Sequence, residues 1–479
     1  MYLGLDLGTS GLKAVLIDGD QQLVAEAKAP LTVQRPQSGW SEQNPADWLA
    51  ATETAMTALA AQHGLDAVRG IGLSGQMHGA TLLDGAGDVL RPCMLWNDTR
   101  SHAEAAAFDA DPQWRRVTGN IVFPGFTAPK VDWVRVNEPE IWEKTAKILL
   151  PKDYLRLWLT GDAVSEMSDA AGTSWLDTGA RDWSDALLDA SGLSRTHMPG
   201  LVEGSAPSGT LRDALADRWG LPKGVVVAGG AGDNAASAVG MGVVKPGQAF
   251  LSLGTSGVLF AASAAYQPDA PSAVHTFCHA LPDTWHQMGV ILACTDALNW
   301  YASLVQSDAG SLTADLGPLQ APGETLFLPY LGGERTPHND AAARGAFLGL
   351  GHATDRTAGT RAVLEGVIFA FRDSLDALRS TGTQIDTLVA VGGGSKSGYW
   401  LQALATLLEM PIDLPEAGDF GGAFGAARLG LMAATGAGAE IATPPATART
   451  IDPDATLTSA FLDKHSQYRA AYAALKEAL

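Results

Sequence analysis

Part of the N-terminal sequence is repeated near the middle of this chain. Residues 3–11 read LGLDLGTSG and residues 249–257 read AFLSLGTSG, about half of the 479-residue chain apart. In each copy a second apolar run follows the Gly-Thr-Ser-Gly turn, which predicts a β-hairpin whose glycines permit positive φ. A five-residue match can also arise by chance in a chain with 54 glycines. As a true repeat, its spacing predicts two related domains that face each other, because solenoid repeats are only about 20–50 residues long.

Strands alternate with helices along the chain. Helical patterns cover residues 44–62, 148–159, 233–240, 295–304, 355–380, 398–408 and 422–431, and strand patterns cover 68–74, 225–228, 250–253, 258–262 and 388–391. This alternation predicts an α/β fold with a largely parallel sheet that binds ligands at the carboxyl ends of its strands. A glycine-rich boundary lies at 240–247, so we expect an N-terminal domain over residues 1–243 and a C-terminal domain over 244–479.

The charge balance restricts the partners of the protein. Its 52 acidic and 32 basic residues give a net charge of −20, which argues against binding to nucleic acid or to an anionic membrane surface. A small anionic ligand remains compatible with this charge if backbone amides or a metal ion bind it. The three cysteines form no CxxC pair, no basic signal segment opens the sequence, and no apolar run approaches the roughly 18 residues of a membrane span. We therefore expect a cytoplasmic protein.

Four glycine-rich turns each follow an apolar strand. They lie at residues 8–11, 229–232, 254–257 and 392–394. Small residues at such positions let the backbone approach an anion closely, and the N–H groups then donate hydrogen bonds to it. One such turn is more typical of an ordinary tight turn. Four of them in one chain favour a phosphate-binding function.

Two known nucleotide-binding motifs do not explain these turns. Residues 230–235 formally match the dinucleotide pattern G-x-G-x-x-A, which needs an acidic residue about 20 positions later for the ribose. After Asp233 the next acidic residue is Asp269, so this match is a false positive. The pattern G-x-x-x-x-G-K-[ST] is absent, because the chain contains no Gly-Lys pair.

Two other kinds of site were also considered. Ser10 to Lys13 and Lys396 to Gly398 imitate the S-x-x-K and K-T-G elements of serine acyl enzymes, but Ser10 lies in a predicted hairpin and no G-x-S-x-G elbow occurs. His275 and His279 have the spacing of metal ligands, yet they lie in an apolar, extended segment without partner carboxylates. Each alternative lacks a necessary part.

Phosphoryl transfer needs phosphate-binding turns, a carboxylate for Mg²⁺ and a carboxylate that deprotonates the accepting hydroxyl. Asp6 ends the first strand, and its counterpart in the repeat is Ser252, so only one copy carries the acid. Asp233 follows a buried strand at the start of a helix, where an N-cap role is the alternative. Asn234 beside it could bind a ligand hydroxyl. These residues are the candidates for catalysis.

The motifs resemble those of the FGGY carbohydrate kinases. The matching stretches are 6–13 and 253–257 for phosphate binding, 232–234 for the catalytic Asp, 392–397 for adenosine, 418–430 for a connecting helix, and the further signatures 125–130 and 345–350. One departure is Ala358-Gly359, where a polar and then an aliphatic residue is usual, and we expect it to affect local packing. The resemblance covers nearly the whole chain. It implies two ribonuclease-H-like domains of the actin, Hsp70 and sugar-kinase type, with a nucleotide cleft between them.

The resemblance also implies roles for individual residues. Mg²⁺ would lie at Asp6 and Asp233, and Asp233 would accept the proton of the sugar hydroxyl. ATP would bind through Gly8, Thr9, Ser10, Lys13, Gly254, Thr255, Ser256, Gly393, Gly394, Ser395 and Lys396. A homodimer is implied by what members of the family often form.

The acceptor is indicated by two further stretches. Residues 74–79 and 95–100 are most similar to those of family members that phosphorylate D-xylulose. Met77, His78, Trp96 and Asn97, with Asp233 and Asn234, would then shape the sugar pocket. The residues alone say only that a polar loop with a histidine and a nearby tryptophan suits a polyhydroxy ligand, and a hydrogen-bonded loop histidine is the equal alternative for His78. L-ribulose, L-fuculose, glycerol or gluconate are alternative acceptors, and a non-catalytic sugar or nucleotide sensor is an alternative function.

Overall fold

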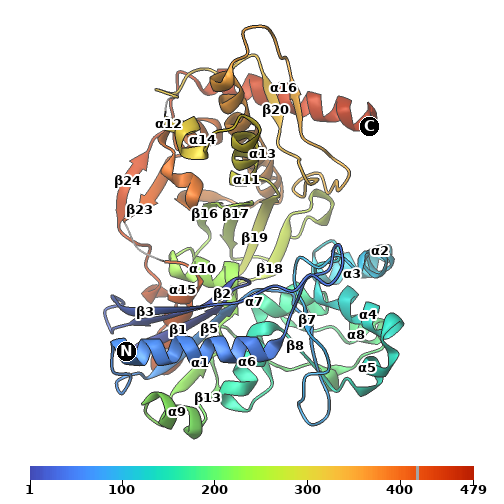
Figure 1. Cartoon of the computed structure of the whole chain (residues 1–479), viewed down its shortest axis with the longest axis vertical. Helices are drawn as coiled ribbons and strands as arrows, with labels where there is room; N and C mark the ends of the chain where they lie inside the picture. Colours follow the sequence, from blue (N-terminus) through green and yellow to red (C-terminus); the bar gives the residue numbers. More distant parts are fainter. Residues whose placement is uncertain (315, 417–419, 479) are drawn as a thin grey trace.

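The molecule has two mixed β-sheets, one from each half of the chain, and one lies above the other along its long axis (Figure 1). The computed structural model describes residues 1–314, 316–416 and 420–478. The first sheet has the strand order β13-β14-β5-β1-β2-β3, with β15 also paired to β5. Its strands are β1 (Tyr2–Leu7), β2 (Gly11–Ile17), β3 (Leu23–Pro30), β5 (Gly70–Gly75), β13 (Pro207–Thr210), β14 (Val226–Ala228) and β15 (Ala231–Gly232).

Helices and short strands surround this sheet, most of them between β5 and β13 in sequence. They are α1 (Pro45–Gln62), β4 (Glu42–Gln43), β6 (Thr81–Leu83), β7 (Cys93–Met94), α2 (His102–Asp109), α3 (Pro112–Thr118), α4 (Thr127–Asn137), α5 (Pro139–Lys144), β8 (Lys147–Leu149), α6 (Pro151–Thr160), β9 (Val164–Glu166), α7 (Met167–Ala170), β10 (Leu176–Asp177), β11 (Asp182–Trp183), α8 (Asp185–Ala190), β12 (Gly200–Val202), α9 (Asp213–Trp219) and α10 (Asp233–Gly240).

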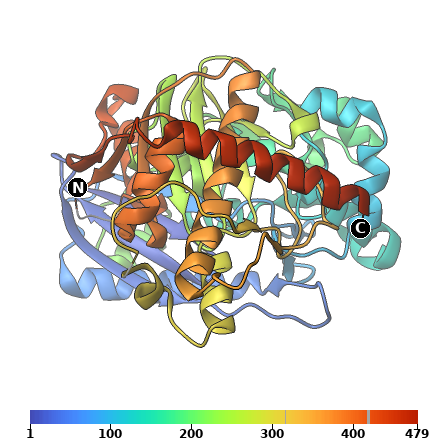
Figure 2. The ribbon, with the colours of Figure 1, turned by 90° about the horizontal axis from the view of Figure 1, so that it is seen from above.

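The second sheet has the order β18-β19-β17-β16-β22-β23-β24. Its strands are β16 (Gly247–Leu253), β17 (Gly257–Ser263), β18 (His275–Cys278), β19 (Trp285–Ile291), β22 (Ile385–Val391), β23 (Ile412–Pro415) and β24 (Thr447–Ile451). The other elements of this half are α11 (Thr295–Leu304), α12 (Ala309–Ala314), β20 (Leu326–Leu328), β21 (Ala346–Leu348), α13 (Arg356–Ser380), η4 (Gly393–Lys396), α14 (Gly398–Leu408), α15 (Gly422–Thr435) and α16 (Thr458–Ala478). Figure 2 shows α16 lying across this half.

The predicted pair of hairpins is confirmed. Strands β1 and β2 pair antiparallel, as do β16 and β17, and the Gly-Thr-Ser-Gly turn connects the strands in each pair. In each half the first hairpin strand also pairs in parallel with a later strand, β1 with β5 and β16 with β22. The sequence repeat therefore corresponds to a structural repeat.

The expectation of a largely parallel sheet is wrong. Among the described residues, only β1, β14 and β15 run parallel to β5 in the first sheet, and only the pairs β16–β22 and β22–β23 are parallel in the second. Each hairpin turn is too short for the crossover that a parallel connection needs, so its strands pair antiparallel. Each sheet consequently has a short parallel centre, and antiparallel strands extend it on both sides.

Most helix predictions are confirmed. Asn44 caps α1 by accepting a hydrogen bond from the amide of Ala46, and Asp355 caps α13 in the same way. The helix predicted over 148–159 is wrong at its start, because residues 147–149 form β8 and α6 begins at Pro151. A proline favours an extended residue before it and is well tolerated in the first turn of a helix.

Helix α15 comes from the C-terminal half but packs on the sheet of the N-terminal half (Figure 1). A Cβ atom on Gly4 of β1 would lie 1.8 Å from the carbonyl oxygen of Ala423, and one on Gly72 of β5 would lie 1.7 Å from that of Ala426. Glycine is thus required for this contact. Residues 418 and 419 of the connecting motif lie outside the described residues.

The substitution Gly72→Ala is expected to destabilise the protein by about 3 kcal/mol or more, because its methyl group would overlap the backbone of α15. Gly85→Ala is the matched control, since a Cβ there meets no described atom within 4 Å. Thermal unfolding of both variants measures the effect. Equal unfolding midpoints would contradict the packing argument.

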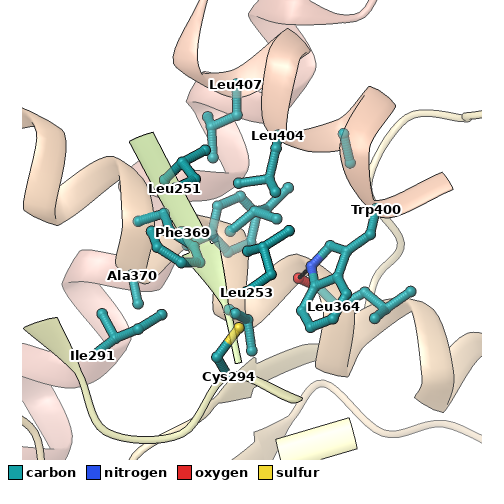
Figure 3. Close-up of a cluster of buried hydrophobic side chains, with 14 of the residues drawn as sticks. Leu251, Leu253, Ile291, Cys294, Leu364, Phe369, Ala370, Trp400, Leu404 and Leu407 are labelled. Carbon is teal, nitrogen blue, oxygen red and sulfur yellow. Dashed lines mark hydrogen bonds between the residues drawn. The ribbon is translucent and has the colours of Figure 1, made fainter. Parts of the chain in front are cut away.

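The glycine-rich turn at η4 packs on the core of the C-terminal half. Figure 3 shows part of this core, including Leu253 and Trp400. Trp400 of α14 is buried and donates a hydrogen bond from Nε1 to the carbonyl oxygen of Leu364, 3.2 Å away. A Cβ on Gly394 would lie 2.9 Å from both the Trp400 ring and the side chain of Leu253. The η4 turn therefore rests directly on this core.

The three cysteines, Cys93, Cys278 and Cys294, are buried and unpaired, as the sequence predicts. Across residues 1–314, 316–416 and 420–478, no helix combines the length and the apolar character needed to cross a bilayer.

Candidate active site

Asp6 and Asp233 lie on either side of the end of β5. In the register of the sheet, Asp6 of β1 is opposite Ser74, and Ala231 of β15 is opposite the same serine from the other edge. The Ser74 hydroxyl donates a hydrogen bond to Asp6 Oδ1 at 2.7 Å. Asp233 is the first residue of α10, and Gly232 occupies the N-cap position, so the N-cap alternative for Asp233 is wrong.

The carboxylate of Asp233 is suited to accept a proton. Burial, and next the negative charge of Asp6, raises the pKa of Asp233 to about 6. The backbone and side-chain nitrogens of Asn234 donate to Asp233 Oδ1 at 2.7 and 2.9 Å, which favours the charged form and fixes its orientation. A carboxylate with a pKa near the working pH is an effective general base.

A pH dependence follows from this pKa. Asp233 accepts a proton only as the carboxylate, so turnover should fall as the pH is lowered through about 6. The pH profile of kcat/KM for the acceptor measures this acid limb. A profile that stays flat down to pH 4.5 would contradict the assignment, because an ordinary aspartate has a pKa of about 3.9.

The turn of the first hairpin is held by a polar network. Thr9 Oγ1 donates to Gln76 Oε1 and accepts from Trp96 Nε1, both at 3.0 Å, and Gln43 Nε2 donates to the Thr9 carbonyl at 2.7 Å. Sequence reasoning missed Gln43 and Gln76. Gln76 lies within the 74–79 motif, whereas nothing in the sequence marks Gln43.

Lys13 and Ser10 have different surroundings. Lys13 Nζ forms a 2.8 Å ion pair with Glu26 of the neighbouring strand β3, and its side chain is largely buried. Ser10 is exposed at the tip of the turn, which the hydrogen bond from the Gly8 amide to the Gly11 carbonyl closes at 3.0 Å. The predicted contacts of both residues with phosphate stay predictions.

The turn of the second hairpin is fixed to α11. Thr295 donates to the Gly254 carbonyl from its amide at 2.9 Å and from its hydroxyl at 2.8 Å, and the Cys294 amide donates to the Thr255 carbonyl at 2.9 Å. The carbonyls of Gly254 and Thr255 are thus hydrogen-bonded to α11, and Ser256 of the turn is exposed.

A cavity of about 660 Å³ lies beside this turn. Its lining includes Gly393, Gly394 and Lys396, which the sequence predicts for adenosine, and also residues of α11 and α12 such as Asn299 and Thr313, which sequence reasoning missed. Ser395 is absent from the lining, and its hydroxyl donates to the Gly392 carbonyl at 2.7 Å. The volume fits a nucleoside.

A second cavity of about 380 Å³ lies between the two halves. Asn234 and Ser237 of α10 line one side, and Ser252 of β16 with Gly392 lines the other. Ser252, the counterpart of Asp6, thus faces the cleft from the opposite half. A ligand in this cavity contacts both halves and lies next to the residue that follows Asp233.

His78 is half-buried and directly follows Met77 in the chain. Its ring stacks on Phe126 with centroids 4.5 Å apart, and Nδ1 lies 2.7 Å from the Gly172 carbonyl. Burial lowers the pKa of His78 to about 3, so the ring is neutral and Nδ1 donates to this carbonyl. Nε2 then carries a lone pair that can accept a hydrogen bond from a ligand hydroxyl.

The other predicted sugar-binding residues have different surroundings. Met77 packs against Gly232, where a Cβ would lie 2.9 Å from the Met77 side chain. Trp96 is 49% exposed. Asn97 Oδ1 is buried and accepts no hydrogen bond from the described residues. The roles of Met77, His78, Trp96 and Asn97 in sugar binding stay predictions.

Sequence reasoning missed Lys130. Its ammonium group donates to the carbonyls of His78 at 3.1 Å and Gly125 at 2.6 Å, and burial lowers the pKa of Lys130 to about 7. Lys130 is the last residue of the 125–130 signature stretch, and this position in the motif is the sequence signal that could have identified it. Lys130 holds the strained backbone of His78, whose φ is +69°.

The histidines at 275 and 279 lie on and just after the extended strand β18. His275 Nε2 lies 3.2 Å from an Arg335 nitrogen, and His279 Nε2 lies 3.1 Å from the Val243 carbonyl. Within the described part of the chain, no three His, Cys, Asp or Glu side chains are grouped to hold a metal. Asp6 and Asp233 still fit Mg²⁺, which proteins often bind through one or two carboxylates together with substrate phosphates.

Comparison with known proteins identifies the family. The N-terminal domain of the FGGY family of carbohydrate kinases matches residues 1–240, and the C-terminal domain of the same family matches residues 249–434. The chain belongs to this family. As a carbohydrate kinase it uses ATP as its co-substrate, and the predicted fold, two ribonuclease-H-like domains of the actin, Hsp70 and sugar-kinase type, is confirmed.

Individual relatives cover almost all of the chain. It is 50% identical to the xylulose kinase of Escherichia coli K12, over 91% of this chain and 90% of the relative. The crystal structure of a xyloylose kinase from Brucella ovis has 63% identity and a TM-score of 0.99, with both chains fully covered. The xylulose kinase of Rhodospirillum rubrum has 29% identity and a TM-score of 0.93, over 99% of each chain.

Proposed function

We propose that this carbohydrate kinase phosphorylates D-xylulose to D-xylulose 5-phosphate with ATP. The observation that carries the proposal is the position of Asp233, a half-buried carboxylate with a raised pKa that opens α10 beside the cleft between the halves. The similarity to proteins named xylulose kinases, at 50% identity over most of the chain, supports this acceptor.

In this mechanism Asp233 removes the proton from the terminal hydroxyl of the sugar. The hydroxyl oxygen attacks the γ-phosphorus of ATP, the bond from the phosphorus to the bridging β,γ-oxygen breaks, and ADP leaves. The two hydrogen bonds from Asn234 keep Asp233 Oδ1 in place, so Oδ2 is directed to the sugar. Phosphoryl transfer depends mainly on such positioning and on charge stabilisation.

Mg²⁺ bound beside Asp6 and Asp233 would neutralise negative charge on the β- and γ-phosphates. Asp6 is oriented for this role by the Ser74 hydroxyl. Because the whole chain carries a net charge of −20, we infer that ATP binding depends on the metal and on local amides.

ATP would extend across the cleft. Its phosphates would lie against the turns at Gly8, Thr9 and Ser10 and at Gly254, Thr255 and Ser256, with adenosine in the 660 Å³ cavity beside η4. Lys13, though paired with Glu26, stays a candidate for offsetting phosphate charge.

The sugar would lie among Met77, His78, Trp96 and Asn97. His78 Nε2 would supply a hydrogen-bond acceptor for a hydroxyl group, and Met77 would supply an apolar wall. Closure of the halves over the ligands would exclude water and prevent ATP hydrolysis. The domain division at 243/244, a homodimer and a cytoplasmic location are also parts of this proposal.

ADP release with MgATP tests the acceptor against D-xylulose, L-ribulose, D-ribulose, glycerol, xylitol and gluconate. We expect D-xylulose to give the highest kcat/KM. A higher value for another sugar or polyol would keep the mechanism but reject the roles of Met77 and His78. No turnover of any acceptor by the wild-type protein would reject the proposed function.

A further inference from the structure

A buried charged cluster lies behind the end of β5, outside the site described above. Its side chains, Lys152, Asp153, Arg156, Glu166 and Asp169, are all fully buried. The Lys152 ammonium lies 2.7 Å from Asp153, 3.0 Å from Asp169 and 3.3 Å from Glu166. Burying so many charges is costly, and apolar residues of the same size are often at least as stabilising. The cluster therefore calls for an explanation other than stability.

Burial shifts the pKa values of two groups in the cluster. Burial, together with the charges of Asp153 and Glu166, raises the pKa of Asp169 well above its usual value, and the Lys152 ammonium opposes this shift. Burial lowers the pKa of Lys152, but the three neighbouring carboxyl groups outweigh it and the net pKa is raised. The two cations, Lys152 and Arg156, thus lie among three carboxyl groups in one buried unit.

One branch of the cluster reaches the residue that precedes Asp233. Glu166 accepts hydrogen bonds from the Ser168 amide at 2.7 Å and from the Ser168 hydroxyl at 3.0 Å. Ser168 Oγ in turn accepts a hydrogen bond from the Gly232 amide at 3.1 Å. Gly232 is the N-cap residue of α10, so Ser168 holds the Ala231–Gly232 peptide, one residue before Asp233.

A second branch holds the start of the same segment. Arg156 donates to the carbonyl of Ala228 at 2.5 Å and to that of Gly229, at the end of β14. The cluster also touches the end of β5, because a Cβ on Gly75 would lie 2.9 Å from Lys152 Cβ. Residues 228–232 are therefore fixed at both ends by one buried unit.

We propose that Ser168 is a positioning residue for Asp233, acting through the Gly232 amide and held in place by the buried Lys152–Glu166 pair. This inference rests on the proposed function, in which Asp233 is the base. Without the Ser168 hydroxyl, the Gly232 amide loses its partner and the first turn of α10 is free to shift. Displacing a catalytic group by about 1 Å costs up to roughly a hundredfold in rate.

Steady-state kinetics of Ser168→Ala with D-xylulose and MgATP test the proposal. We expect kcat to fall about ten- to a hundredfold. The KM values for sugar and MgATP should stay within about twofold, because Ser168 contacts neither proposed binding region. Ser168→Thr keeps the hydroxyl and should restore most of kcat. If Ser168→Ala yields no folded protein, Ser168→Cys replaces it with the same expectation, since a thiol accepts hydrogen bonds weakly.

Ser165→Ala is the matched control. Ser165 is also buried, and its hydroxyl donates to Asp153 Oδ2 of the same cluster at 2.6 Å, whereas Ser168 is the residue bonded to the 228–233 segment. We expect this variant to lose stability and to keep the wild-type kcat. Wild-type kcat in Ser168→Ala, or an equal loss in Ser165→Ala, would overturn the proposal.

Hydrogen exchange separates failure of this inference from failure of the proposed function. In Ser168→Ala, but not in Ser165→Ala, backbone amides of residues 229–236 should exchange faster, whatever the enzyme phosphorylates. Unchanged exchange in this segment would overturn the positioning role. A wild-type protein that turns over no acceptor, with faster exchange in Ser168→Ala, would reject the function and keep the contact.

Discussion

The substitution Asp233→Asn is expected to lower kcat for sugar phosphorylation by about a thousandfold. Asparagine has nearly the same shape, so α10 and its packing against α15 should persist. It cannot accept the proton of the attacking hydroxyl, and general-base catalysis contributes roughly 10²–10⁴-fold to a rate. Single-turnover phosphorylation of D-xylulose, with MgATP affinity measured by calorimetry, separates the chemical step from binding.

Asp213→Asn is the control for this variant. Asp213 is the first residue of α9, as Asp233 is of α10, but it is exposed and pairs with Lys223 at 3.3 Å. We expect wild-type kinetics from it. If Asp233→Asn kept more than about a tenth of kcat, the loss would be too small for a general base and the assignment would be wrong.

The features that short sequence patterns encode were predictable. The two hairpins follow from apolar runs around Gly-Thr-Ser-Gly, and helix starts follow from caps such as Asn44 and Asp355. Asp6 was singled out because the repeat lacks its acid at Ser252. Such signals are local, so they can be read from the sequence without information about tertiary contacts.

Features that depend on distant contacts were not predictable. Gln43 supports Thr9 from 34 positions away, and the walls of the large cavity come from α11 and α12. The packing of α15 on β1 and β5 joins opposite ends of the chain. Periodicity reveals that a helix has an apolar face but does not identify the surface that covers it.

Asp6→Asn is expected to have the other large effect, on the metal requirement. Losing one of two carboxylates should raise the Mg²⁺ concentration for half-maximal activity about tenfold. It should also lower kcat about a hundredfold at saturating Mg²⁺, because less charge stabilisation reaches the transferring phosphoryl group. Mg²⁺ titrations of D-xylulose phosphorylation at fixed ATP measure both effects, and a chelator should abolish activity in the wild type.

Asp20→Asn controls for the loss of one negative charge from the same half of the molecule, since Asp20 is exposed in the turn between β2 and β3. An unchanged Mg²⁺ requirement in Asp6→Asn would contradict a role in metal binding. Because the Ser74 hydroxyl donates to Asp6 Oδ1, Ser74→Ala should give a smaller shift in the same direction. We expect the Mg²⁺ concentration for half-maximal activity to be highest for Asp6→Asn, lower for Ser74→Ala and at the wild-type value for Asp20→Asn. This order would distinguish an oriented metal carboxylate from a general effect of charge.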